Sequence, residues 1–196
     1  MAIYGAGGHA KVIADIALEL NIDIQYFIDI KPIEPIFSIP VVLPENALAK
    51  NLPHIIALGN NAVREKVANS LATTFTILVH PKATISKHSI LGEGTVVMAG
   101  ATVNAATVVG KHCIINTNAS IDHDCTLGDY VHISPNATLC GTVTVAHGTH
   151  IGAGATVIPN ISIGNNCVVG AGSVVIRNVP DNCVVVGNPA RVIKKL

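Results

Sequence analysis

The 196-residue chain has no tryptophan, few other aromatic residues and little charge. Charged residues make up 12% of it, with twelve Lys and Arg balancing twelve Asp and Glu, whereas a soluble domain usually carries roughly 25%. Binding to nucleic acids requires clustered Lys and Arg, so we expect no nucleic-acid partner. No apolar run approaches the ~20 residues of a membrane span, and no basic leader opens the chain. These absences favour a cytoplasmic protein.

Paired cysteine motifs are also absent. The five cysteines are odd in number and none lies in a Cys-x-x-Cys pair, so the sequence predicts neither a disulfide framework nor a zinc site. The scarcity of aromatic residues leaves the core to Val, Ile, Leu and Ala. Such side chains suit a repeated structure of small cross-section.

An aliphatic residue stands at every sixth position from Val79 to Val175, seventeen times without a miss. A second series, four residues after the first and running from Ala83 to Val179, is small or β-branched throughout. A helix would repeat with a period of about 3.6 and a strand with a period of about two. A strict period of six therefore predicts a β-solenoid, in which each six-residue unit, or hexad, supplies one short strand and one corner. Both series are expected to point inward.

These hexads resemble those of the hexapeptide-repeat acyltransferases. The pattern of an aliphatic residue, Gly or Asp, two variable residues, a small residue and a variable one stands in residues 91–96 and 151–156. In that family three hexads form one triangular coil, the helix is left-handed, and the chain leaves the last coil at a segment similar to Gly187–Arg191. The resemblance implies an all-β left-handed parallel β-helix over residues 79–196.

Residues 1–78 lack this register and have the pattern of a small α/β domain. We expect strands at four places, residues 3–4, 24–28, 55–58 and 75–78. Helices are expected after the first and third strands, where apolar residues recur at helical spacing. Prolines between residues 32 and 53 predict a loop with at most a short helix near residues 46–50. The sequence thus predicts a parallel sheet of about four strands, half of a Rossmann fold.

A glycine motif, Gly5-x-Gly7-x-x-Ala10, follows the first expected strand. Glycines at this place permit a tight turn and let an anion approach the free N–H groups of a helix N-terminus. Because so short a domain supplies only one half of a dinucleotide fold, we expect a ligand of mononucleotide size. A tight turn without a ligand is the alternative. Asp29 and Gly59-Asn60 end neighbouring strands at the same edge and favour the ligand.

This half resembles the nucleotide-binding domain of bacterial sugar acetyltransferases of the bacillosamine pathway and of their sialic acid O-acetyltransferase relatives. The resemblance rests on residues 4–10, residues 56–61 and Asp29. In the bacillosamine enzymes this edge binds the UDP-amino-sugar. The resemblance therefore implies six substrate-binding residues: Gly7, Gly8, His9, Asp29, Gly59 and Asn60. A second acidic residue, which often follows the aspartate in that family, is replaced by Ile30 here.

The densest polar cluster of the hexads spans residues 116–124 and contains His123 and Asp124. These two residues occupy the third and fourth places of their hexad, at a corner where side chains can point outward. Acyl transfer from a thioester requires a base of near-neutral pKa, which histidine supplies and a neighbouring carboxylate strengthens. A solvated His-Asp pair without a catalytic role is the alternative. The pair matches the family's catalytic histidine and following acidic residue, which implies a general base and its supporting carboxylate.

His132 lies eighteen residues before His150, so the two are expected to stack on successive coils. The resemblance implies an acetyl-CoA channel lined by four residues: His132, Gly141, Ala153 and Ala171. A polar surface ladder is the alternative for His132, and His147 and His150 are expected at the surface. No two histidines lie thirty-six residues apart, the spacing expected of a zinc site in the related γ-class carbonic anhydrases, so we expect no metal.

Together the two resemblances imply an acetyl-CoA-dependent N-acetyltransferase that acts on a UDP-linked 4-amino-6-deoxy sugar by direct transfer, with His123 as the base. O-acetylation of sialic acid or another sugar is the first alternative, and a non-catalytic β-solenoid scaffold is the second. Flat faces of low charge indicate an interface. The resemblance implies a homotrimer with acetyl-CoA between adjacent protomers.

Overall fold

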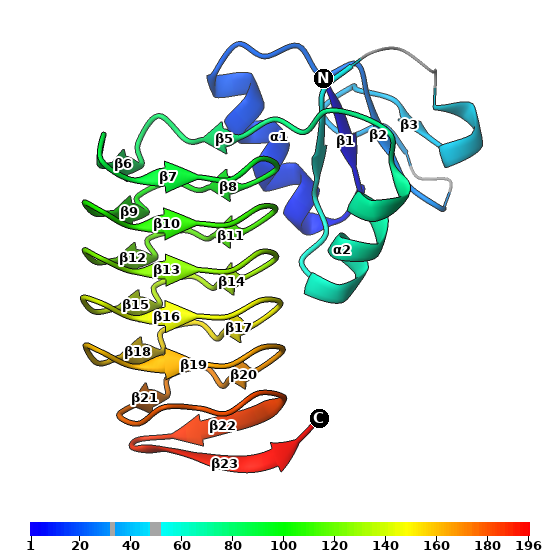
Figure 1. The fold of residues 1–196 in the computed structure, drawn as a ribbon. Coiled ribbons are helices and arrows are strands. Elements are labelled where there is room, and N and C mark those ends of the chain that lie inside the picture. Colours follow the sequence, from blue (N-terminus) through cyan, green and yellow to red (C-terminus); the bar gives the residue numbers. More distant parts are fainter. Residues whose placement is uncertain (32–33, 48–51) are drawn as a thin grey trace.

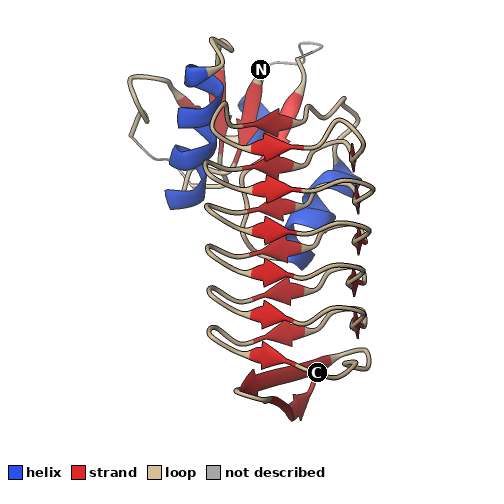
Figure 2. Cartoon of the chain, turned by 90° about the vertical axis from the view of Figure 1, so that its left-hand side faces the viewer, coloured by secondary structure: helices blue, strands red, loops and turns tan. Residues whose placement is uncertain are grey.

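A computed structural model describes residues 1–31, 34–47 and 52–196. The chain forms a small α/β domain followed by a left-handed parallel β-helix (Figure 1), and this confirms the predicted fold class. The α/β domain lies beside the first coils, and the last coils extend beyond it (Figure 2). Within the described residues, no helix is long and apolar enough to cross a membrane.

The sheet of the α/β domain has four parallel strands in the order β3-β2-β1-β4. They are β1 (Ala2–Tyr4), β2 (Tyr26–Ile28), β3 (Val41–Val42) and β4 (His54–Ile56). Helix α1 (Gly8–Glu19) follows β1, and helix α2 (Asn61–Ser70) follows β4. The carboxyl ends of β1, β2 and β4 therefore meet at one edge, as the sequence predicted.

The fourth strand of this sheet is not the expected one. Strand β3 lies in the proline-rich stretch predicted to be a loop, where Val41 pairs with Phe27. In the segment 75–78, Phe75 forms only an isolated bridge with His54, because the chain is already turning toward the first coil. Of the short helix expected near residues 46–50, the structure has the 3₁₀ turn η1 (Pro44–Asn46), while residues 48–51 lie outside the described residues.

The β-helix is a triangular prism whose strands pair with those one coil, or eighteen residues, later, as Ile114 pairs with His132. Face 1 contains β5 (Leu78–Val79), β8 (Val96–Val97), β11 (Ile114–Ile115), β14 (His132–Ile133), β17 (His150–Ile151), β20 (Val168–Val169), β22 (Cys183–Gly187) and the antiparallel β23 (Ala190–Lys195). Face 2 contains β6 (Thr84–Ile85), β9 (Thr102–Val103), β12 (Ser120–Ile121), β15 (Thr138–Leu139), β18 (Thr156–Val157) and β21 (Val174–Val175). Face 3 contains β7 (Ile90–Leu91), β10 (Val108–Val109), β13 (Thr126–Leu127), β16 (Thr144–Val145) and β19 (Ser162–Ile163).

The two hexad series fill the prism, as predicted. From Thr95 to Val179 every member of either series is buried, and only the first coil leaves members such as Val79 and Ile85 half-buried. Small residues of the second series allow the three faces to approach one another closely. The core is thus a narrow aliphatic column with no room for a charged side chain.

The fourth place of every hexad from Gly94 to Gly172 has a positive φ, which turns the chain from one face to the next. Gly and Asn occupy most of these places because they tolerate this conformation. Asp124 is one of these turn residues, with φ of 58°. The corner that carries the candidate base therefore has the same backbone as the others and differs only in its side chains.

The α/β domain packs against face 1 through a shared apolar core. Ile13 and Ile16 of α1 belong to one buried cluster with Leu78, Val96 and Ile114, the outward-facing residues of β5, β8 and β11. These three coils thereby lose their solvent-exposed side of face 1. The carboxyl edge of the sheet comes to lie over the next two strands, β14 and β17.

Candidate active site

His123 and Asp124 form an ion pair at the corner between faces 2 and 3. The Nδ1–H of His123 donates to Asp124 Oδ2 over 2.7 Å, and both side chains are 58% exposed. Within the described part of the chain, no group bonds to Nε2 of this ring. The hydrogen bond to Asp124 and the charge of Asp122 raise the pKa of His123. The ring therefore presents an unoccupied, basic nitrogen to solvent.

Gly141 lies one coil later at the same corner, beside the ring of His123. The other two residues expected to line the acetyl-CoA channel, Ala153 and Ala171, are exposed at the corner between faces 1 and 2. They lie on successive coils, where the N–H of Gly172 donates to the carbonyl of Ala153 over 2.8 Å. One chain therefore places Gly141 with His123, and Ala153 and Ala171 on a different edge of the prism.

The glycine loop of the α/β domain is held by Asp29. Its Oδ2 accepts the N–H of Ala6 over 2.9 Å, and its Oδ1 accepts the N–H of Lys31 over 3.1 Å. Gly7 and Gly8 begin helix α1 and are exposed, and a Cβ at either position would meet nothing within 4 Å. The first turn of α1 contains no acidic residue. The free N–H groups there can receive an anion.

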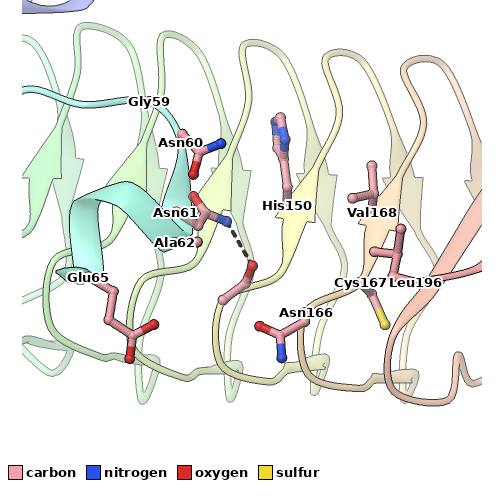
Figure 3. A pocket seen from close by; sticks show the side chains of 11 residues that line it. Gly59, Asn60, Asn61, Ala62, Glu65, His150, Asn166, Cys167, Val168 and Leu196 are labelled. Atoms are coloured by element: carbon pink, nitrogen blue, oxygen red, sulfur yellow. Dashed lines mark hydrogen bonds between the residues drawn. The ribbon is translucent and has the colours of Figure 1, made fainter.

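A pocket of about 330 Å³ separates the N-terminus of α2 from face 1 (Figure 3). Gly59 and Asn60 form one wall, and His150 and Val168 form the other. Asn60 caps the helix by accepting the N–H of Val63 over 3.0 Å, so its side chain also has a structural role. The Nδ2 of Asn61 donates to the carbonyl of Gly148 over 2.8 Å and ties the helix to the prism.

His132 lies in the junction between the α/β domain and face 1, not on a surface ladder. It is 9% exposed, and its ring stacks on that of His150 with centroids 4.6 Å apart. Burial, then the neighbouring His150 and Arg64, lower the pKa of His132 to about 3. The stacking prediction is confirmed, and the surface alternative is wrong because the α/β domain covers this part of face 1.

His9 joins His132 in the junction. Burial and the charge of Arg64 lower the pKa of His9 to about 4. The Nε2 of His9 and the Nδ1 of His132 are buried without a hydrogen-bond partner among the described residues, while Asn116 Nδ2 lies 3.1 Å from Nε2 of His132. The junction thus contains uncharged imidazoles with free polar atoms, at the edge where substrate was expected.

His147 and His150 are not simple surface residues. His150 is half-buried, with Ser134 Oγ at 2.7 Å from its Nε2, and His147 pairs with Glu65 of α2 over 3.2 Å. The first contact joins successive coils of the prism, and the second arises because α2 lies against this side of the prism (Figure 1). The sequence places both histidines on outer positions and does not reveal that another domain covers them.

Arg64 is the residue of this junction that the sequence did not reveal. Its side chain is buried, with 1% exposure. Five hydrogen bonds of 2.8–3.4 Å join it to four main-chain carbonyls and one side-chain amide oxygen: those of Leu58, Gly59, His112, Tyr130 and Asn61. Burial lowers its pKa to about 10, so the group stays charged at neutral pH. Arg64 fixes the Gly59 loop to two coils of the prism.

The described residues contain no cluster of three or more His, Cys, Asp or Glu side chains suited to a metal ion.

Residues 1–71 match the family model described as PglD N-terminal domain, and residues 106–141 and 142–177 each match the model described as bacterial transferase hexapeptide (six repeats). A curated relative, the UDP-N-acetylbacillosamine N-acetyltransferase of Bacillus subtilis (strain 168), is 44% identical over 110 residues. The match covers 50% of this chain and 51% of that protein, so the chain spans about half the length of this relative.

Solved structures match almost the whole chain. The acetyltransferase domain of PglB from Neisseria gonorrhoeae FA1090 is 37% identical, with 98% of each chain covered and a TM-score of 0.93. The same domain is known in complex with acetyl coenzyme A. PerB from Caulobacter crescentus, solved in complex with CoA and GDP-perosamine, is 35% identical over 98% of this chain and 96% of its own, with a TM-score of 0.92.

Proposed function

Because the chain belongs to the hexapeptide-repeat family of acetyl-CoA-dependent sugar N-acetyltransferases, we propose that it acetylates the amino group of a nucleotide-linked amino sugar. More narrowly, we propose a UDP-linked 4-amino-6-deoxy sugar as the acceptor and the cytoplasm, where acetyl-CoA is available, as the location. Relatives named for UDP-linked and GDP-linked sugars support the substrate class. Family membership favours this enzyme over the scaffold alternative.

The observation that carries the proposal is the geometry of His123. Its Nδ1–H is committed to Asp124 over 2.7 Å, which leaves the lone pair of Nε2 directed away from the carboxylate. The tautomer is fixed because an ionised carboxylate can only accept. A base of raised pKa at an exposed corner is what an incoming amine requires.

The chemistry needs no covalent enzyme intermediate. The amine nitrogen attacks the thioester carbonyl carbon, and Nε2 of His123 takes the proton that the nitrogen loses. The new C–N bond forms as the C–S bond breaks, and the imidazolium then protonates the departing CoA thiolate. The products are the N-acetylated sugar and CoA, and His123 returns to its neutral form. Asp124 stabilises the imidazolium between the two proton transfers.

The α/β domain supplies the proposed site for the nucleotide sugar. The free N–H groups of Gly7 and Gly8 would receive the diphosphate, with His9, Gly59 and Asn60 around it. Asp29 would act by holding the glycine loop, because both of its oxygens already bond to main-chain N–H groups. An Asp29→Ala variant should therefore raise KM for the nucleotide sugar and leave acetyl-CoA binding unchanged.

A homotrimer would unite groups that one chain holds apart. His123 and Gly141 occupy one corner of the prism, Ala153 and Ala171 another, and the junction with His132 lies on face 1. We propose that adjacent protomers bring the corner of one chain to the acetyl-CoA-lining residues of the next. Three prisms around one axis would close such an assembly.

Subunit mixing tests this arrangement. Inactive His123→Ala chains, mixed with chains blocked by a bulky residue at Ala171, should regain part of the activity after subunit exchange. Some interfaces would then pair two intact surfaces. A monomer in sedimentation equilibrium would exclude the shared site, and verified mixed trimers without recovery would confine each site to one chain.

A thiol-release assay tests the reaction itself. The acceptors are UDP-, GDP- and dTDP-linked 4-amino sugars and free sialic acids, with acetyl-CoA as donor. Activity with the UDP-linked amino sugar, lost ~10²–10⁴-fold in His123→Ala with little change in either KM, supports the proposal. Preference for a GDP- or dTDP-linked sugar would correct the nucleotide only. Acetylation of free sialic acid alone would replace N-acetylation by the O-acetyltransferase alternative.

A further inference from the structure

We propose that Asp122 is a positioning residue for His123, which fixes the main chain that enters the corner and adds a second carboxylate beside the imidazole. The inference rests on the proposed role of His123 as the base. Asp122 bonds to the main chain of His123 and not to its ring, and the resemblance of the His123–Asp124 pair to the family motif implies no role for it.

The first support is a pair of hydrogen bonds to one oxygen. Asp122 follows β12 on face 2, and its Oδ1 accepts the N–H of His123 over 2.8 Å. The same Oδ1 accepts Nδ2 of Asn104 over 2.9 Å. Because Asn104 lies on the preceding coil, one carboxylate ties the residue that carries the base to the neighbouring rung of the prism. Two donors on one oxygen, one from the same coil and one from the preceding coil, restrict the orientation of this carboxylate.

The second support is the charge that this arrangement maintains. The bond from Asn104, then the bond from the N–H of His123, lower the pKa of Asp122 and keep it ionised. Its charge acts on His123 together with the directly bonded Asp124, and both raise the pKa of the ring. Among the described residues, the titratable groups that interact with Asp122 and its neighbours also include the thiols of Cys125 and Cys140. The imidazolium is therefore stabilised by the charges of two carboxylates, of which only Asp124 bonds to the ring.

The hydrogen bonds of Asp122 and its negative charge can be removed separately by different substitutions. Asparagine has the shape of aspartate, and its Oδ1 can accept the same two N–H donors without the charge. Asp122→Asn should therefore keep the main chain in place and remove only the negative charge that acts on the His123 ring. Asn104→Ala does the reverse, because it removes one bond and leaves the carboxylate beside the ring.

The last coil supplies a matched control. Asp181 accepts the N–H of Asn165 at Oδ1 over 2.7 Å and Nδ2 of Asn165 at Oδ2 over 3.1 Å. This is the same type of contact between neighbouring coils, at a corner between faces 3 and 1 rather than the corner of His123. Asp181→Asn thus removes an equivalent charge far from His123 and tests whether the loss of any one carboxylate from the protein has the same effect.

The experiment combines pH profiles with a titration of the ring. The profile of kcat/KM is measured with the thiol-release assay, and the His123 resonances are followed by NMR and assigned with His123→Ala. In Asp122→Asn the acid limb and the His123 titration should both move to lower pH, with KM changed by less than about twofold. Asp181→Asn should coincide with wild type. Asn104→Ala should leave the acid limb of the kcat/KM profile at the same pH as in wild type and should lower kcat.

The readouts separate this inference from the proposed function. If His123→Ala retains full activity, His123 is not the base and both proposals are overturned. If His123→Ala is inactive but Asp122→Asn coincides with wild type in both the pH profile and the ring titration, the role of Asp122 alone is overturned. A shift in Asp181→Asn equal to that in Asp122→Asn would also overturn it, since the effect would then not be local.

Discussion

Gly141 faces the imidazole of His123 across one coil spacing, and the ring occupies the space that a side chain at position 141 would need. A Cβ on Gly141 would come within 2.6 Å of Cε1 and 2.7 Å of Nε2 of His123. Carbon atoms do not approach so closely, so the two positions cannot both hold a side chain in this arrangement. The absence of a side chain at Gly141 is therefore a condition for the orientation of the base.

Gly141→Ala should lower kcat by ~10–100-fold while the protein stays folded, because the exposed ring of His123 can swing away from the new methyl group. The measurement is steady-state kinetics of Gly141→Ala, His123→Ala and the double variant. If displacement of His123 is the whole effect, the double variant should be no slower than His123→Ala alone. Additive losses would mean that Gly141 contributes independently of His123.

Val145→Asp should prevent folding of the β-helix, because Val145 is fully buried in the aliphatic column and an aspartate there would carry an unpaired charge. The neighbouring variant Thr144→Asp is the control, since Thr144 is exposed on face 3. Circular dichroism and size-exclusion chromatography should show a folded Thr144→Asp protein and no folded Val145→Asp protein. A stable, soluble Val145→Asp protein would contradict the inward register.

Arg64→Met should destabilise the protein by about 3 kcal/mol, because the carbonyls of Leu58, His112 and Tyr130 would each lose a buried donor. Removal of the desolvated charge returns part of that loss. Arg64→Lys, which keeps the charge but not the planar fork, should be intermediate. Urea unfolding measures both. A Met variant as stable as wild type would show that the bonds of Arg64 to His112 and Tyr130 do not stabilise the contact between the two domains.

His132 should make the protein less stable as the pH falls below about 6.5. The pKa of His132 is about 3 in the folded protein and 6.5 in the unfolded chain, so the unfolded chain binds the proton first on acidification. Stability attributable to this group is complete above pH 6.5 and is lost progressively down to about pH 3. At pH 5 the loss is about 2 kcal/mol.

Chemical denaturation of wild type and His132→Gln between pH 7.5 and 5 tests this dependence on pH. The glutamine variant cannot gain the proton, so its free energy of unfolding should fall less steeply over this range. Because His9 also has a lowered pKa, part of the slope should remain. Identical slopes in the two proteins would assign the effect to other groups.

The sequence reveals the prism because its core repeats without interruption, and an inward position such as Ile133 has the same surroundings in every coil. It reveals His123 and Asp124 because they stand in the densest polar cluster of the repeat, next to each other at an outward corner. Strand β3 escapes prediction because two residues between prolines have no period. Arg64 escapes because its acceptors are mostly main-chain carbonyls, which have no sequence signature. The burial of His132 depends on where the α/β domain docks, which the hexads do not encode.

Each strand pairs with the one eighteen residues later, so positions along the prism axis are set by the number of whole coils. Loss or gain of eighteen residues would shift everything beyond it by one rung, ~4.8 Å, and return each remaining side chain to its own face. Loss of six would instead rotate every later residue onto the next face. Insertions or deletions of whole coils between His123 and the C-terminal hairpin would therefore change the distance between them in steps and leave the cross-section unchanged. They would also leave His123 at the corner between faces 2 and 3.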